Sequence, residues 1–172
     1  MCITIKPMSL YRLLILFVFL HFGAVTIKAD GQEVVGGIEV NGLTMCGKYT
    51  REQIFAALGG QPDRIVQDQE EPTYYEYHYG EDVFYHMGDE FYGGYIKTPR
   101  YSVSGGIKIG DNVVEINKLN GACYSGVYDK SKYAGVVRWR PSKDPKWEWL
   151  IVEFYYDAQG LIAGIEIHIF YL

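Results

Sequence analysis

Side chains with the usual chemistry of an active site are sparse in this 172-residue chain. After residue 29 the histidines are His78, His86 and His168, and they lack the His-x-x-x-His or Cys-x-x-Cys spacing of a zinc site. The stretch Gly121-Ala-Cys123-Tyr-Ser125 has part of a nucleophile-elbow pattern, but it lacks the second glycine and follows an expected helix. We therefore expect no catalytic residues, no metal site and no cofactor.

Aromatic side chains are the unusual feature of the sequence. The chain has 16 tyrosines and 3 tryptophans, side chains that combine a large contact area with a polar tip and suit recognition of proteins or stacking on sugars. In the expected strand 146–156, Trp149 and Tyr155 share one side with Glu153, which would be costly to bury unpaired. We predict that this side stays open to solvent. The candidate binding residues are Trp147, Trp149, Tyr155, Tyr75, Tyr77, Trp139 and His168.

Carboxylates beside these aromatics leave an alternative function open. Glu148, Glu153 and Glu166 lie on the same two expected strands, and paired carboxylates flanking a sugar ring carry out glycoside hydrolysis. The first hypothesis is a non-enzymatic protein that binds another envelope or secreted protein. The alternative is a small carbohydrate-binding or hydrolytic protein that uses the same face.

The N-terminal segment has the pattern of a secretory signal. Lys6 and Arg12 precede the apolar run 13–20, and small residues follow up to Ala29. The run is short for a membrane-spanning helix, and Cys2 lies at the wrong end for a lipoprotein cysteine. We predict that residues 1–29 are a signal peptide cleaved near Ala29. A periplasmic or secreted protein with no membrane insertion would result.

The charge balance of the remaining chain is acidic. Residues 1–29 contain three of the 16 basic residues and none of the 21 acidic ones, so their removal leaves a net charge of about −8. This balance disfavours nucleic acid and anionic membranes as partners. The remaining roughly 140 residues suffice for one domain with a real core. The expected partner is a protein of unknown identity, and the sequence gives no indication of the oligomeric state.

Two cysteines remain after the signal segment, Cys46 and Cys123. Each lies beside an expected helix, Cys46 before the first and Cys123 after the second. An exported protein meets an oxidising compartment, so a disulfide between them is one possibility. The other is a pair of small buried thiols.

A short sequence repeat organises the chain. Residues 50–62 align with residues 111–123, and each copy begins with a helix-capping side chain, Thr50 or Asp111, and ends in glycine. This predicts helices over 50–58 and 111–119, each followed by antiparallel strands with apolar alternation. We predict an α+β fold. Two units, 30–104 and 105–172, each a helix plus a β-meander, would form one continuous sheet with helices packed on one face.

The pattern Thr-x-x-Gln-x-x-x-x-Leu-Gly-x-x-Pro at 50–62, with Tyr156-Asp-Ala-Gln-Gly160 before the closing strand, resembles the SmpA/OmlA (BamE) family. The same unit occurs in tandem in the β-lactamase-inhibitory protein fold, and the resemblance covers residues 36–172. It implies an exported binding protein, inhibitor-like or assembly-like, with a shared concave sheet. The second unit departs from it, because Asn120-Gly121-Ala-Cys123 replaces Gly-x-x-Pro. No partner carries over.

Overall fold

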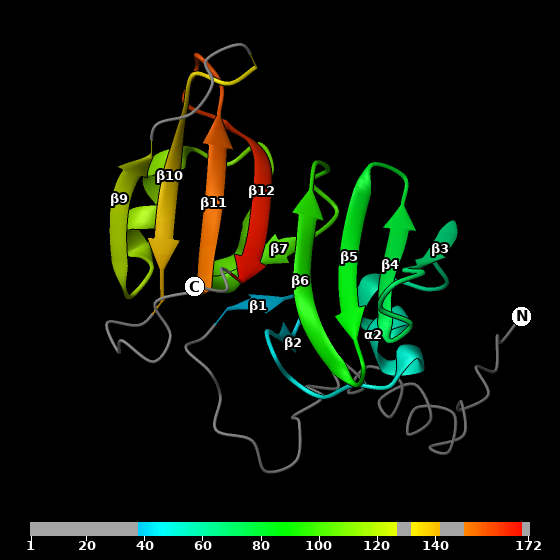
Figure 1. Ribbon diagram of the computed structural model, residues 1–172. Coiled ribbons are helices and arrows are strands. Elements are labelled where there is room, and N and C mark those ends of the chain that lie inside the picture. Colours follow the sequence, from blue (N-terminus) through cyan, green and yellow to red (C-terminus); the bar gives the residue numbers. More distant parts are fainter. Residues whose placement is uncertain (1–37, 127–131, 142–149, 170–172) are drawn as a thin grey trace, which may run out of the picture.

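The computed structural model describes residues 38–126, 132–141 and 150–169. The expected signal peptide, Trp147 and Trp149 therefore lie outside the described residues. Figure 1 shows the elements in place. They are β1 (Glu39–Val40), β2 (Leu43–Thr44), α2 (Arg51–Leu58), β3 (Arg64–Gln67), β4 (Tyr74–Tyr79), β5 (Asp82–Met87), β6 (Glu90–Ile96), β7 (Ser102–Val103), the 3-10 helix η1 (Ser104–Gly106), β8 (Ile107–Lys108), the 3-10 helix η2 (Val113–Lys118), β9 (Ala122–Gly126), β10 (Gly135–Arg140), β11 (Leu150–Tyr156) and β12 (Ile162–Ile169).

An antiparallel sheet of eight strands forms the body of the protein, in the order β3-β4-β5-β6-β12-β11-β10-β9. Strands from the two halves of the chain meet where β6 pairs with β12, with Tyr95 opposite Glu166 and Gly94 opposite Ile167. Gly93 makes this junction possible, because a Cβ there would lie 2.7 Å from the Ile167 carbonyl oxygen of β12. Gly94 allows the close approach of β6 to β5 on its other side, since a Cβ there would lie 2.3 Å from the Val83 carbonyl oxygen.

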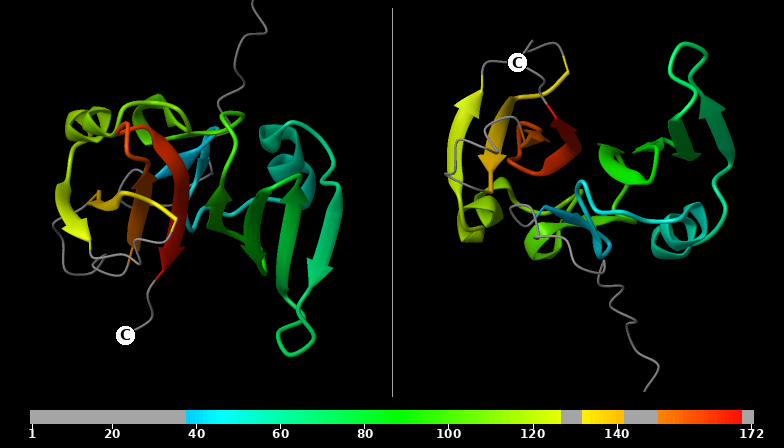
Figure 2. Two further views of the ribbon diagram at one scale, coloured as in Figure 1. Left: turned by 90° about the horizontal axis from the view of Figure 1, so that it is seen from above. Right: turned by 60° about the horizontal axis from the view of Figure 1, so that its bottom comes forward.

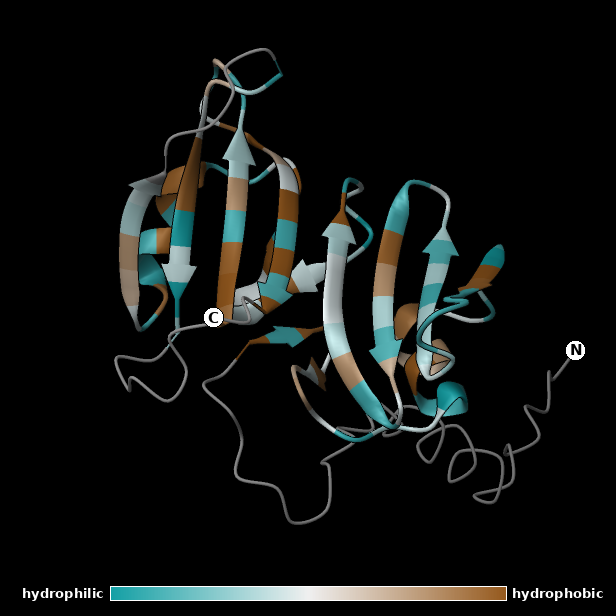
Figure 3. Cartoon of the chain, in the orientation of Figure 1, coloured by the Kyte–Doolittle hydropathy of each residue, from teal (hydrophilic) through white to brown (hydrophobic). Residues whose placement is uncertain are grey.

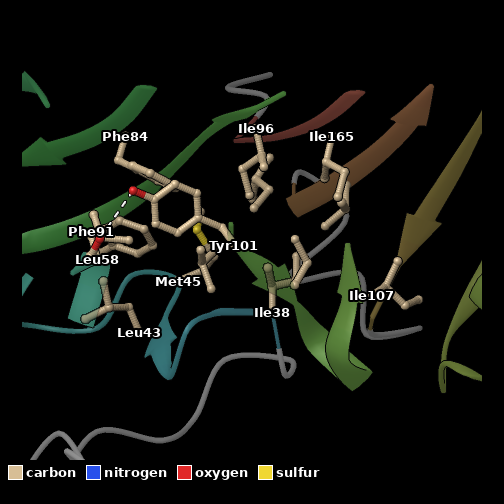
Figure 4. Packing of buried hydrophobic residues seen from close by; sticks show 14 of the residues in the cluster. Ile38, Leu43, Met45, Leu58, Phe84, Phe91, Ile96, Tyr101, Ile107 and Ile165 are labelled. Carbon is tan, nitrogen blue, oxygen red and sulfur yellow. Dashed lines mark hydrogen bonds between the residues drawn. The ribbon is translucent and has the colours of Figure 1, made fainter. Parts of the chain in front are cut away.

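A second, four-stranded sheet has the order β2-β1-β7-β8. Together with α2 and the two 3-10 helices it lies on one side of the large sheet (Figure 2). The main core fills the space between the layers. In Figure 4 the side chains of Ile38 and Met45 face those of Phe84, Ile96 and Ile165, which come from the large sheet.

The helix α2 begins and ends as the sequence predicts. The Thr50 side chain accepts a hydrogen bond from the Gln53 N–H, and the Gln53 side chain accepts one from the Thr50 N–H, which completes a capping box. Gly59 ends the helix in the left-handed conformation, at φ 92°. Phe55 packs edge-on against Tyr77 of the sheet, with 5.0 Å between ring centroids.

The predicted fold class is wrong, because the described chain is mostly β and contains two antiparallel sheets rather than two helix-plus-meander units. The expected second helix, 111–119, is the 3-10 helix η2, and its side-chain cap is Asn112 rather than Asp111. Val113 and Val114 are β-branched and disfavour an α-helix. The Val113 N–H, which lies too near the helix start to have a partner within the helix, bonds to the Gly160 carbonyl and ties η2 to the turn before β12.

The strands of the first meander, β4 to β6, confirm the alternation in the sequence, and β10 covers the expected 135–140. Residues 122–126, expected in a loop, form the edge strand β9, which pairs with β10. Strands β7 and β8 of the small sheet were also not anticipated. Within the described residues we find no helix with the length and apolar character needed to span a membrane.

We predict that Gly94→Ala destabilises the protein by roughly 3 kcal/mol, the upper part of the usual overpacking range, because the new methyl group meets a backbone carbonyl in the middle of the sheet. Gly164→Ala on β12 is the matched control. Its Cβ would come no closer than 3.1 Å, to the movable Tyr133 hydroxyl. Urea unfolding measures both, and equal losses for the two variants would contradict the tight approach at Gly94.

Candidate functional site

The large sheet has a core side and an opposite side, which we call the open face and which faces the viewer in Figure 1. Side chains alternate between the two sides along each strand. On β11, Val152 and Phe154 belong to the main core, whereas Tyr155 belongs to a separate small cluster on the open face. Glu153 shares the side of Tyr155. The search for a site therefore starts on this face.

Charged side chains form a row across the open face. Arg138 on β10 lies opposite Glu153 on β11, and Glu153 lies opposite Glu166 on β12. Figure 3 shows hydrophilic bands side by side on β10, β11 and β12. Two like charges directly opposite each other would destabilise the sheet. The Arg138 Nε atom donates a hydrogen bond to Glu153 Oε1 in an ion pair, which compensates part of that repulsion.

Tyr155 and His168 complete this carboxylate cluster. The Tyr155 hydroxyl contacts Glu153 Oε2 and, at 2.9 Å, Glu166 Oε2, so its single proton is shared between two carboxyl groups. Burial and then these two bonds raise the pKa of Tyr155. The His168 ring lies between the same acids, with Nδ1 3.4 Å from Glu166 Oε1 and Nε2 3.6 Å from Glu153 Oε2. We call Arg138, Glu153, Tyr155, Glu166 and His168 the carboxylate cluster.

The centre of the carboxylate cluster is covered, whereas the Arg138, Glu166 and His168 side chains at its edge are partly exposed. Glu153 is 5 % exposed and Tyr155 is 3 % exposed. The ring of Tyr133, from the segment before β10, stacks on Tyr155 with 5.0 Å between centroids, and its hydroxyl lies 3.0 Å from the hydroxyl of Tyr95. The prediction that the Glu153 and Tyr155 side of this strand stays open is therefore wrong. Glu153 is buried because Arg138 and Tyr155 satisfy it, which the argument from an unpaired charge did not consider.

The more exposed part of the open face lies over β3, β4 and β5. Tyr74 and Tyr85 are stacked across the strands with 5.9 Å between ring centroids. Beside them, His78 Nε2 lies 3.1 Å from Glu76 Oε2, and an Arg64 nitrogen lies 3.2 Å from His78 Nδ1. Burial, and then the negative charges of Glu76 and Glu166, raise the pKa of Tyr85. Tyr85 thus lies near acidic side chains of both parts of the open face.

Most of the described candidate binding residues lie elsewhere than expected. Tyr77 is fully buried in the main core, and Trp139 is also buried there, with its indole N–H donating to the Asn120 carbonyl at 3.1 Å. Tyr75 lies on the same core side and is half-buried. The Arg51 guanidinium lies 3.9 Å from the centroid of its ring. These three residues are corrected to packing residues. Alternation assigns residues to two sides of a strand but does not say which side will be covered.

Two of the candidate residues, Tyr155 and His168, do meet in the carboxylate cluster. The sequence reasoning missed their partners Arg138, Tyr95 and Tyr133, and it missed the Tyr74–Tyr85 pair. A signal for Arg138 was available, because it is a charged residue between apolar neighbours in the middle of strand 135–140. Within the described residues, no group of three histidine, cysteine or acidic side chains is placed to hold a metal ion.

Of the two alternatives for the cysteines, the disulfide is not formed, and Cys46 and Cys123 are both free thiols. The Cys46 N–H bonds to the carbonyl of Phe91 on β6, whereas Cys123 lies on the edge strand β9. Four strand spacings separate β6 from β9 in the sheet, or roughly 19 Å. That distance is far beyond the Cα separation of a disulfide.

We predict that Arg138→Met costs about 3 kcal/mol of stability, since it leaves the buried Glu153 carboxylate without its cation. The double variant Arg138→Met/Glu153→Gln should be more stable than Arg138→Met alone, because the unpaired charge is gone. A double-mutant cycle from urea unfolding measures this coupling. Additive losses would show that the two side chains do not depend on each other.

The stability of the protein should depend on the ionisation of Glu166. Its hydrogen bond with His168 lowers the pKa of Glu166 below the ordinary 4.5, against the opposing effect of burial. A carboxyl group whose pKa is lower in the folded state contributes stability above its unfolded pKa and loses it as the pH falls through the folded pKa. Unfolding free energies measured from pH 6 down to about pH 3 should therefore fall less steeply for Glu166→Gln than for the natural chain. Glu81→Gln, at an exposed turn, is the control, and parallel curves for all three proteins would contradict this.

Comparisons with known proteins give little further information. A scan against protein-family models finds no match, and a search of curated proteins finds none. Among solved structures, the chain is similar to a 1.5 Å crystal structure of an extracellular protein containing a SCP domain from Bacillus anthracis str. Ames, with a TM-score of 0.42 and 14% identity. The match covers 82% of this chain and 47% of that chain, so this chain spans about half the length of its neighbour. The likeness carries no argument about function, and the resemblance to the SmpA/OmlA family stays a prediction.

Proposed function

We propose that this protein is an exported, non-enzymatic binding protein that recognises another protein through the open face of the large sheet. The observation that carries the proposal is the stacked pair Tyr74–Tyr85, half-buried on that face between carboxylates. On a face exposed only to solvent, the large apolar area of an aromatic ring contributes little to stability. In an interface, the same rings supply contact area at a small cost in side-chain entropy.

The surroundings of this pair favour recognition because they are ordered before a partner arrives. Tyr85 is stacked on Tyr74, and the neighbouring Glu76 and His78 side chains are hydrogen-bonded to each other. Side chains that are already fixed lose less entropy on binding. The acidic balance of the chain, −5 over the full sequence, disfavours nucleic acid and anionic membrane surfaces and supports a protein partner.

The alternative, a sugar hydrolase acting through Glu153 and Glu166, fits the geometry less well. Both carboxyl groups contact the same Tyr155 hydroxyl, so no sugar ring fits between them. Glu153 is also ion-paired to Arg138 and buried. A general base needs access to the proton that it removes. The arrangement of the cluster favours a structural role within the open face.

Export rests on the order of charged, apolar and small residues over 1–29, which lie outside the described part of the structure. We assign the mature protein to the periplasm or the exterior of the cell. The resemblance to SmpA/OmlA units supports the same assignment, with an inhibitor-like or assembly-like role. N-terminal sequencing of the exported protein tests it directly, and retention of Met1 would overturn it.

We predict that a photo-crosslinking amino acid at position 85 captures a specific protein from the envelope and secreted fraction of the producing cells. The matched control is the same amino acid at position 114, because Val114 is 57% exposed on η2, away from the open face. Tyr85→Ala should then weaken binding of the purified partner by about 30-fold, as loss of an interface anchor does. Val114→Ala should leave the affinity unchanged.

Two outcomes would contradict the proposal. Equal capture from positions 85 and 114 would mean that the open face is not the recognition surface. Saturable binding to a defined sugar on a glycan array, lost in Tyr85→Ala and unaccompanied by a captured protein, would favour the carbohydrate-binding alternative instead.

A further inference from the structure

A second candidate site lies on the core side of the sheet, where the turn between β5 and β6 meets the start of α2. A pocket of about 350 Å³ is lined there by Lys48, Arg51, Gln53, His86 and Asp89, among others. It is separate from the open face, because His86 shares the side of the core residue Phe84 on β5. Its walls carry two cationic side chains and the N-terminal turn of a helix, which has a positive partial charge.

His86 is the feature of this pocket that the fold does not explain. It is 3 % exposed, and its Nδ1 atom lies 2.9 Å from the Tyr77 hydroxyl. Its Nε2 atom is buried and has no hydrogen-bond partner. The carbonyl groups of Tyr49 and Asp89 are nearby acceptors that raise the pKa of the ring, but Nε2 forms a hydrogen bond of good geometry with neither. Burying such a group without a partner is costly.

The neighbouring side chains determine which ring nitrogen carries the proton. Arg51 hydrogen-bonds to the Tyr77 hydroxyl, and a guanidinium group can only donate. Tyr77 therefore accepts from Arg51 and uses its own proton for His86 Nδ1. Burial, followed by the positive charge of Arg51, lowers the pKa of His86, which keeps the ring neutral. In the neutral ring Nε2 then carries the remaining hydrogen, so it is an unused donor beside the pocket.

The cations around the pocket are held in place. The Arg51 guanidinium lies 3.9 Å from the Tyr75 ring centroid, a cation–π contact that fixes its direction. Lys48 lies 3.1 Å from Asp89, and this exposed ion pair neutralises the acid on the pocket wall. The capping box satisfies the Thr50 and Gln53 N–H groups. Glu52 bonds to its own N–H and is not among the lining residues.

We propose that this pocket binds a small oxyanion, with His86 Nε2–H and the Arg51 guanidinium as donors and the N-terminus of α2 as supporting positive charge. An oxyanion supplies the acceptor that the buried Nε2–H lacks. Phosphate and carboxylate groups share this chemistry, and the oxyanion accepts charge-assisted hydrogen bonds from Arg51. The site stands independently of the protein-binding function proposed for the open face.

The test is titration of the full mature chain with inorganic phosphate and, in a second arm, with acetate. Sodium chloride holds the ionic strength constant at pH 7.5, and calorimetry is combined with NMR of the histidine ring nitrogens. We expect saturable binding with a Kd on the order of 1 mM and a shift of the His86 Nε2 resonance that follows the same curve. Binding of both anions identifies a general oxyanion site, and binding of phosphate alone identifies a phosphate site. Both results support the proposal.

Arg51→Gln should weaken binding about tenfold or more, since it removes a charged donor. Arg64→Gln, which removes an arginine of the open face, is the matched control and should bind as the natural chain does. The ring resonances of the unaltered protein keep the test independent of whether a variant folds. A His86 resonance that does not move, or equal binding by Arg51→Gln and the natural chain, would overturn the proposal.

Discussion

The pairing of β6 with β12 is the contact on which the rest of this structure depends. Only three residue pairs join the two strands, Ile96 with Ile165, Tyr95 with Glu166 and Gly94 with Ile167. They merge the strands of both halves into one sheet, and they place Tyr95 beside Glu166, near Tyr133. Gly93 on β6 allows the close approach, because a Cβ there would collide with the Ile167 carbonyl of β12. The pairing of β6 with β12 therefore determines which side chains of the two halves lie next to each other on the open face.

Two buried polar side chains illustrate how the sheet treats groups that cannot be left without partners. Glu153 on the open face is satisfied by hydrogen bonds from Arg138 and Tyr155. Both of its oxygens are therefore occupied, so neither is available to act as a catalytic base. His86 on the core side is satisfied at Nδ1 only. The contrast matters because a buried donor without a partner costs stability. Proteins that retain such a group commonly use it.

The sequence was most informative where a local rule decides the structure. The Thr50–Gln53 capping box fixed the start of α2, and apolar alternation located β4, β5, β6 and β10. It was least informative where contacts between residues distant in the sequence determine the local structure or the burial of a side chain. The 3-10 helix η2 depends on a bond from Val113 to Gly160, and the burial of Glu153 depends on Arg138 in the neighbouring strand. Sheet order also separates Cys46 from Cys123 and places Tyr77 and Trp139 inside.

Hydrogen exchange of the backbone amides of residues 94–96 and 165–167 tests most directly whether one sheet carries the proposed binding face across both halves of the chain. In a single continuous sheet these amides exchange only through global unfolding, with protection equal to that of β5 and β11. Rapid exchange at 94–96 and 165–167, while β5 and β11 stay protected, would mean that the two halves are separate sheets. The open face would then not exist as one surface.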